Sequence, residues 1–400
     1  MKILHSGDWH IGELTGPVVD GQNARLMDTI QCIDHLIETA KQEQPDVIVI
    51  PGDLFDKSKL WSDTMLYLID IAAKKLRQCA GVAPTVLLFG TENHDNPMAF
   101  KNIRSMGIPN LYVITKPQIF TIQTNSGPLQ IAGVPGLDKG NFRTLNPGMD
   151  PSEENQVCSK LLGDVVLGLG AQVNPEMPSI MLAHYSIAGC ELDNGQQHIF
   201  TQNEVILPRE ALTVSPFDLV CLGHIHRAQE VPHCDRPVFY SGSLNGLTFN
   251  EEGQEKGFWI HDINNKKHAG FCYQHISRFI KTPAREFLTM EVDFTDSVDL
   301  QFDMKWKLAG IGPDMANTLL TFPTVSKIVR LHFRCTDDQA KQLSLKEMEK
   351  LLLTGGAFYV SEIKRIKDVD YLSKQELSEN TGPMESLRTW CRVNGLAPEE

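Results

Sequence analysis

Short apolar runs alternate with amphipathic stretches between residues 1 and 275. Apolar residues at helical spacing predict helices over residues 23–42 and 65–80. Runs of β-branched and other apolar residues predict buried strands at residues 2–8, 46–53, 85–90, 129–136, 179–186, 219–226 and 258–263. Because strands that alternate with helices form βαβ units, this region is predicted to be a layered α/β structure.

The pattern changes near residue 280, where apolar and polar residues alternate as they do in half-buried strands. Strands are predicted at residues 286–294, 327–335 and 357–366, and helices near residues 305–320 and 345–353. This layout indicates a small α+β domain, which a linker and an amphipathic helix over residues 384–396 follow. The expected parts are therefore the main domain at 1–278, the second domain at 279–375, and the linker with the terminal helix at 376–400.

Composition narrows the class of protein. A chain of 400 residues is long enough for two or three domains, and its 42% hydrophobic share is typical of a globular protein. None of the nine cysteines forms a CxxC pair, which indicates reduced thiols in a cytoplasmic protein and not a zinc ribbon or a disulfide framework. No signal peptide or membrane-spanning run is expected, and the formal charge of −13 argues against a chain that holds nucleic acid by bulk electrostatics alone.

Polar side chains follow five of the predicted strands. In α/β proteins ligands gather at the carboxyl ends of strands. The side chains at these positions are Asp8, His10, Asp53, Asn93, His184, His224 and His226. Each has an ordinary alternative, because aspartate caps helices and turns and a single histidine is often a satisfied core residue. Five strand ends that each supply a ligand type nevertheless indicate one shared site.

The ligand types indicate which metal this site would hold. Carboxylate, amide oxygen and imidazole together favour Mn²⁺, Fe²⁺ or Zn²⁺ over Ca²⁺, and the lack of thiolates argues against structural zinc. Seven candidates exceed what one ion needs, so we expect two divalent ions, with Mn²⁺ favoured, that share a bridging carboxylate. Two such ions clamp a phosphoryl group, so the chemistry predicted is metal-assisted hydrolysis of a phosphoester.

These residues resemble a known family. The stretches GDWH (7–10), GDLFD (52–56), NHD (93–95), AH (183–184) and GHIH (223–226) are similar to the five motifs of calcineurin-like metallophosphoesterases. Residues 240–263, YSGSLNGLTFNEEGQEKGFWIHDI, look like the stretch after the last motif in SbcD-type nucleases of DNA double-strand-break repair. The resemblance covers about residues 1–275 and implies two mixed sheets flanked by helices, with a small α+β capping domain that guides DNA.

The resemblance also implies a role for each matching position. One ion would be held by Asp8, His10, Asp53 and His226, and the other by Asp53, Asn93, His184 and His224. The resemblance places His94 beside the scissile phosphate, where it would stabilise charge or protonate the leaving oxygen. It gives Asp56 a secondary role near the metals, and a residue at the start of a helix is the alternative.

The third motif departs from the family pattern. The family usually has Gly-Asn-His-Asp without interruption, whereas Thr91 and Glu92 stand between Gly90 and Asn93 here. If Asn93 is still the ligand, the turn after the strand must bulge and place the two additional residues at the rim of the site. The alternative is a weakened or lost site. We favour a retained site, because every other ligand position is filled.

Three functions remain open at this point. The first is a DNA exonuclease or endonuclease subunit that works with an SbcC-like coiled-coil ATPase in repair and recombination, as a homodimer within a heterotetramer. The second is a phosphodiesterase or phosphatase of the same superfamily acting on a nucleotide or small molecule, and the third is a non-catalytic scaffold. For the first, the terminal helix would contact the ATPase through Leu387 and Trp390; packing on its own domain is the alternative.

Overall fold

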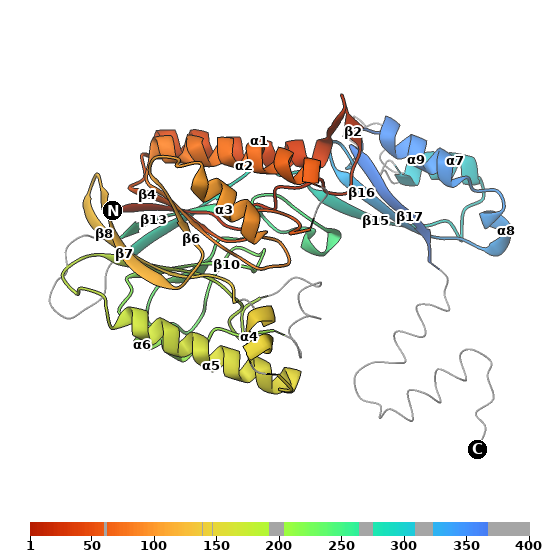
Figure 1. Cartoon of the computed structure of the whole chain (residues 1–400). Coiled ribbons are helices and arrows are strands. Elements are labelled where there is room, and N and C mark those ends of the chain that lie inside the picture. The colour runs from red at the N-terminus through yellow and green to blue at the C-terminus, as the bar shows by residue number, and fades with distance from the viewer. Residues whose placement is uncertain are drawn as a thin grey trace, which may run out of the picture. The chain divides into compact units, whose positions relative to one another are not determined.

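The computed structural model describes seven stretches of the chain: residues 1–59, 62–137, 139–145, 147–191, 204–263, 275–308 and 323–366. The chain divides into two compact units, Met1–Arg285 and Glu286–Glu400 (Figure 1). The residues 376–400, with Leu387 and Trp390, lie outside the described stretches. None of the helices in the described part of the chain is both long and apolar enough to cross a lipid bilayer.

The first unit contains two six-stranded mixed sheets. The first sheet has the order β14 (His275–Lys281), β13 (Gly257–Ile263), β1 (Lys2–His5), β4 (Val47–Pro51), β5 (Thr85–Leu88) and β6 (Leu111–Ile114). The last four of these strands pair in parallel, and β13 is antiparallel to both β1 and β14. Because β14 pairs with β13 over its whole length, the first unit extends past the boundary predicted at residue 278.

The second sheet has the order β11 (Gln229–Glu230), β12 (Val238–Tyr240), β10 (Leu219–Gly223), β9 (Ser179–His184), β8 (Gly127–Val134) and β7 (Gln118–Thr124). Its four central strands are parallel, and the two edge strands are antiparallel to their neighbours. The two mixed sheets confirm the layered fold predicted from the sequence.

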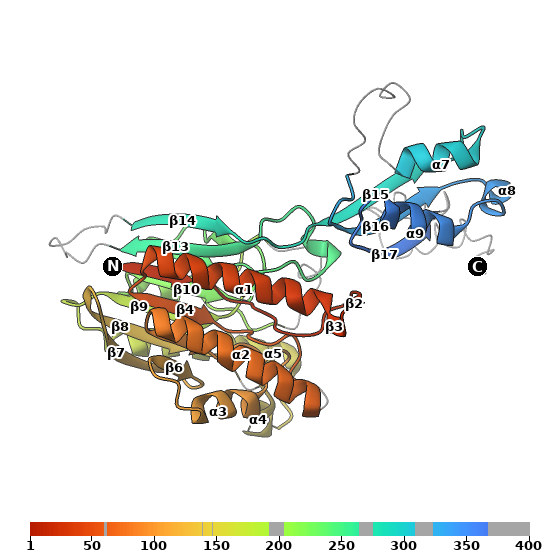
Figure 2. The same cartoon turned by 90° about the horizontal axis from the view of Figure 1, so that it is seen from above.

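Successive apolar side chains of the central strands point to opposite faces of each sheet and form three apolar cores. In β1, Ile3 packs between the two sheets and Leu4 packs toward the helices, because successive side chains of a strand point to opposite faces. The helices over the first sheet are α1 (Ala24–Glu43), α2 (Ser62–Val82) and α3 (Pro97–Ser105), and those over the second are α5 (Pro151–Gly170) and α6 (Arg209–Val214). Figure 1 shows these helices on the outer faces of the two sheets, and Figure 2 shows α1 and α2 from above, in front of the first sheet.

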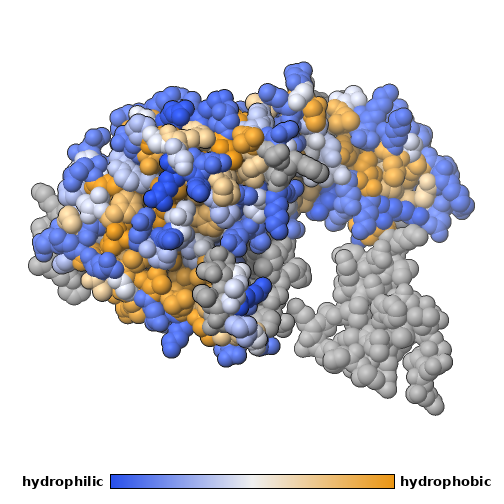
Figure 3. Space-filling model, in the orientation of Figure 1, coloured by the Kyte–Doolittle hydropathy of each residue, from blue (hydrophilic) through white to orange (hydrophobic). Residues whose placement is uncertain are grey.

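The remaining short elements of this unit are β2 (Val18–Val19), β3 (Gln22–Asn23), α4 (Lys139–Leu145) and the 3₁₀ turn η1 (Phe249–Glu251). Figure 3 shows apolar areas on the outer surface. The exposed apolar side chains include Val157, Leu161 and Leu167 of α5. Exposed single apolar residues of this kind are ordinary on a globular surface.

The second unit contains a three-stranded sheet in the order β15 (Phe287–Asp293), β16 (Ile328–Arg334) and β17 (Tyr359–Arg365). Its helices are α7 (Leu300–Leu308), α8 (Asp337–Ala340) and α9 (Leu345–Thr354). The three strands lie within two residues of their predicted bounds. The α+β layout predicted for this region did not specify strand direction, and both pairs are parallel.

Candidate metal centre

The loops that follow β1 and β4 are joined to each other by backbone hydrogen bonds. Asp8 N donates to Gly52 O at 3.1 Å and His10 N donates to Asp53 O at 3.1 Å. Three of these residues have a left-handed backbone, with φ of 52° at Asp8, 46° at His10 and 48° at Asp53. A side chain in this conformation costs about 1–2 kcal/mol, so the fold holds these residues in place at the expense of local backbone stability.

Glycines let the strand ends approach each other closely. A Cβ on Gly52 would lie 2.3 Å from His184 Nδ1, and one on Gly223 would lie 2.2 Å from Pro51 O. Both distances are far below van der Waals contact. The glycine that precedes Asp53 and the glycine that precedes His224 are therefore required for the two sheets to bring their ligand types together.

The first group of side chains contains Asp8, His10 and His226, whose candidate ligand atoms lie within 4.8 Å of one another. Glu251 Oε1 lies 3.1 Å from His226 Nδ1, so we assign the proton to Nδ1, which donates to that carboxylate. The unprotonated Nε2 of His226 then faces His10 Nε2 at 3.1 Å. A ring nitrogen presented in this way is suited to bind a metal ion, because its carboxylate partner orients it.

Glu251 is itself held as an anion. Burial would raise its pKa, but His226 and Lys256 lower the pKa of Glu251 to about 2. Lys256 Nζ lies 2.6 Å from Glu251 Oε2 and also donates to His226 O at 3.1 Å. This buried ion pair keeps the carboxylate charged and directed at His226.

The second group contains Asp53, His184 and His224, again with candidate ligand atoms within 4.8 Å of one another. His184 Nδ1 donates to Pro51 O at 2.6 Å, which directs Nε2 at Asp53 Oδ2, 3.1 Å away. The backbone N–H of His224 donates to Asp8 Oδ1 at 2.9 Å, and this contact links the second group to the first.

His184 Nε2 and Asp53 Oδ2 can lie this close only with a proton or a cation between them. Burial alone would lower the pKa of His184, but the Asp53 carboxylate outweighs it and raises the pKa to about 10. Burial likewise opposes the ionisation of Asp53, yet His184 holds the pKa of Asp53 well below its usual value. Within the described residues, His10 Nδ1 and His184 Nε2 are buried without a hydrogen-bond partner. The donor set therefore fits divalent metal ions.

His94 and Asp56 lie beside these groups. With His10 they form a third set of candidate ligand atoms within 4.8 Å, and the His94 ring centroid is 4.6 Å from that of His10. His94 Nδ1 donates to Asp56 O at 2.5 Å, which leaves Nε2 free to exchange a proton 3.9 Å from Asp53 Oδ2. Asp56 lies in a bend well before α2 begins at Ser62, so it is not the first residue of that helix.

The structure therefore brings together six of the seven predicted ligands, namely Asp8, His10, Asp53, His184, His224 and His226. The seventh, Asn93, is exposed, and its backbone carbonyl accepts a hydrogen bond from Ser58 N at 3.0 Å. The residue that contacts Asp53 from this loop is Thr91, through its backbone N–H and its hydroxyl.

Three residues that contact the predicted ligands could not be predicted from the sequence pattern. Glu251 holds His226, Thr91 contacts Asp53, and the carboxylate of Glu204 contacts His224 Nε2. Glu251 falls inside the stretch 240–263, but nothing in its spacing separates it from the neighbouring glutamates. Only the distances between loops identify these residues.

Comparison with known proteins identifies the family. The family model described as calcineurin-like phosphoesterase matches residues 1–228. The chain belongs to the calcineurin-like phosphoesterase family. A Staphylococcus epidermidis protein, the SbcD subunit of the nuclease SbcCD, is 24% identical over 316 residues, which are 77% of this chain and 76% of that protein.

Two solved structures also resemble the chain. GAP50, the anchor in the inner membrane complex of Plasmodium, is 13% identical and has a TM-score of 0.42, over 71% of this chain and 85% of that one. A dimetal phosphatase from Danio rerio is 11% identical and has a TM-score of 0.41, over 65% of this chain and 91% of that one.

Membership of the calcineurin-like phosphoesterase family confirms two predictions. The chain is a hydrolase of phosphoester bonds, and the chemistry depends on divalent metal ions. The donor groups built from the strand ends of this phosphoesterase fit that requirement, because two of their buried ring nitrogens have no hydrogen-bond partner in the described structure.

Proposed function

We propose that the protein is the nuclease component of a DNA-processing complex and hydrolyses phosphodiester bonds with two divalent ions, preferably Mn²⁺. The observation that carries the proposal is a site with two adjacent donor groups in a chain that shares 24% identity with a nuclease subunit over most of both lengths. Asp8, His10 and His226 would hold one ion, and His184 and His224 the other. Asp53 would bridge the two ions.

Two divalent ions supply Lewis acidity for attack of water on a phosphodiester. The protein's own contribution begins with orientation, since Glu251 and the Pro51 carbonyl fix the ring nitrogens that His226 and His184 present. We propose that His94 Nε2 holds or donates the proton of the leaving oxygen. Its other nitrogen is occupied by Asp56 O, so that Nε2 is the atom left to exchange a proton.

We further propose that productive DNA binding requires an SbcC-like ATPase, in a cytoplasmic complex that contains a homodimer of this chain. The chain has 37 basic and 50 acidic residues, whereas affinity for duplex DNA depends on neutralising phosphates with Lys and Arg. The proposed tether is the segment 384–396. Leu387→Glu combined with Trp390→Ala should abolish co-purification with the ATPase and leave hydrolysis of a small phosphodiester intact.

The deciding experiment is hydrolysis of linear duplex DNA with Mn²⁺, with and without the ATPase, beside bis(p-nitrophenyl) phosphate as a small phosphodiester. Cleavage of DNA that the ATPase stimulates, and that Asp53→Asn abolishes, supports the proposal. Hydrolysis of the small phosphodiester alone would identify a small-molecule phosphodiesterase. Binding of the ATPase without any hydrolysis would identify a scaffold.

A further inference from the structure

The two additional residues of the third motif are accommodated by one helical turn. Thr91 O accepts hydrogen bonds from His94 N at 3.1 Å and from Asp95 N at 2.7 Å, which closes the segment on itself. Glu92 and Asn93 lie on the exposed side of this turn. His94 returns to the metal centre, so the turn keeps one motif residue in the site and moves another out of it.

Thr91 forms hydrogen bonds to one oxygen of the Asp53 carboxylate. Its backbone N–H donates to Asp53 Oδ1 at 2.8 Å, and its hydroxyl donates to the same oxygen at 3.0 Å. The other oxygen, Oδ2, faces His184 Nε2 at 3.1 Å and His94 Nε2 at 3.9 Å. Oδ1 of this buried carboxylate therefore accepts hydrogen bonds from Thr91, and Oδ2 faces the metal centre.

We infer that Thr91 is a positioning residue of the metal centre, which acts by fixing Asp53 with Oδ2 directed at the ions, and that Asn93 is not a ligand. The inference rests on the metal centre proposed above. Donors on Oδ1 prevent rotation of the carboxylate, which would otherwise exchange its two oxygens. A ligand oriented by hydrogen bonds of this kind binds metal more tightly than a free one.

The rest of the loop keeps Asn93 from replacing Thr91. Asp95 Oδ1 accepts from Leu54 N at 2.8 Å and from Phe55 N at 3.2 Å, and its Oδ2 accepts from Gly90 N at 2.8 Å. These bonds anchor the segment on both sides of the turn. Bringing the Asn93 side chain to Asp53 would break them together with both Thr91 donors, and each buried donor left unpaired costs about 1–3 kcal/mol.

The test measures binding of Mn²⁺ to the full chain by calorimetry for three variants, with thermal unfolding as a check of folding. Thr91→Val removes the hydroxyl at constant shape and should weaken binding of at least one ion by about 10–100-fold. Thr91→Ser restores the donor and should bind as wild type. Asn93→Ala should bind both ions as wild type does.

The outcomes separate this inference from the proposed function. Loss of an ion in Asn93→Ala, with wild-type affinity in Thr91→Val, overturns the inference and makes Asn93 the ligand. Wild-type affinity in all three variants also overturns it, while two ions in the wild-type chain keep the proposed centre. A wild-type chain that binds no Mn²⁺ overturns the proposed centre and, with it, the role of Thr91.

Discussion

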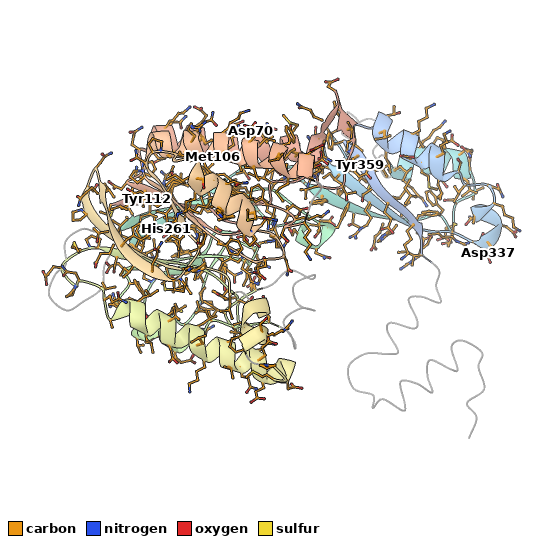
Figure 4. The ribbon with its side chains drawn as sticks, in the orientation of Figure 1. Asp70, Met106, Tyr112, His261, Asp337 and Tyr359 are labelled. Carbon is orange, nitrogen blue, oxygen red and sulfur yellow. The ribbon has the colours of Figure 1, made fainter. Side chains whose placement is uncertain are left out.

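Two groups of buried histidines lie in the first unit, and they differ in how their ring nitrogens are paired. One is the metal centre at the strand ends. The other, here the inter-sheet histidine chain, consists of His5, His261 and Ser277 beside Cys221 (His261 is labelled in Figure 4). In both, three candidate ligand atoms lie within 4.8 Å of one another. Distance alone therefore does not distinguish a metal site from a structural cluster.

In the inter-sheet histidine chain each ring nitrogen has a protein partner. His5 Nε2 donates to Leu222 O at 3.0 Å, so His5 Nδ1 accepts from His261 Nε2 at 3.3 Å. His261 Nδ1 then accepts from the Ser277 hydroxyl at 2.7 Å. One arrangement of neutral rings satisfies every atom, and burial keeps them neutral by lowering the pKa of His5 to about 3.

In the metal centre neutral rings cannot complete the corresponding arrangement, because His184 Nε2 faces the Asp53 carboxylate and His10 Nδ1 has no hydrogen-bond partner. Carbonyl or carboxylate oxygens occupy Nδ1 of His184, His226 and His94, and the nitrogens left over face a carboxylate or another ring. From this difference we expect the metal ions at the cluster in which neutral rings leave ring nitrogens unpaired. Variants in the metal centre should therefore change metal binding. Variants in the inter-sheet histidine chain should change the stability of the fold and leave metal binding as it is.

The largest effect is expected from Asp53→Asn. This change removes the charge that would bridge the two ions, so at least one Mn²⁺ should be lost from the full chain, as measured by calorimetry. Hydrolysis of bis(p-nitrophenyl) phosphate should fall on the order of 10³-fold or more, since metal stabilisation of the transition state is worth several kcal/mol. The matched change Ser277→Ala in the inter-sheet histidine chain should leave both quantities as in wild type. Equal metal binding in Asp53→Asn and wild type would contradict the comparison.

The next effect is expected from His94→Ala. Because a proton-transfer role is worth about 10²–10⁴ in rate, turnover should fall by that factor while the content of bound Mn²⁺ stays the same. The control is His233→Asn, which changes an exposed histidine with φ of 60° to a residue that tolerates this backbone conformation. Loss of metal from His94→Ala, with normal activity per bound ion, would make His94 a ligand.

A smaller effect is expected from Glu251→Gln. The neutral amide leaves Lys256 without its anion and weakens the hold on His226 Nδ1, so affinity for one Mn²⁺ should fall by about 10–100-fold. Glu255→Gln is the matched control, because Glu255 is exposed and pairs with Lys281 on the surface. Should both variants bind Mn²⁺ equally well, Glu251 has no part in orienting His226.

The smallest effect concerns the inter-sheet histidine chain and pH. His5 has a pKa of about 3 in the folded chain against an ordinary value of 6.5, so between these values the unfolded chain binds a proton that the folded chain does not. As far as His5 is concerned, the free energy of unfolding is therefore highest above pH 6.5 and falls as the pH drops toward 3. His5 should contribute a loss of about 1.4 kcal/mol per pH unit.

Denaturant unfolding across the upper half of that window, on wild type and His5→Gln, measures this contribution as a difference in slope. The variant should show the shallower dependence on pH. Equal slopes would mean that His5 is protonated in the folded chain, and the distinction between the two clusters would be lost.

Much of the fold follows from local patterning. The central strands β1, β4, β5, β9 and β10 and the helix α1 lie close to their predicted bounds, because burial on both faces makes apolar runs and amphipathic helices visible in the sequence. The edge strands β6, β7 and β14 and the helix α5 were not predicted. Their pairing and burial depend on a neighbouring strand or sheet and not on their own periodicity.

The metal centre, like the fold, could be predicted from the sequence only in part. Six ligand candidates could be predicted, because they directly follow parallel strands, and ligands gather at the carboxyl ends of such strands. The contacts of Thr91 with Asp53 and of Glu251 with His226 join residues 38 and 25 positions apart. Only the tertiary structure decided them, since a hydrogen bond depends on where two loops meet in space, and no spacing along the chain encodes that distance.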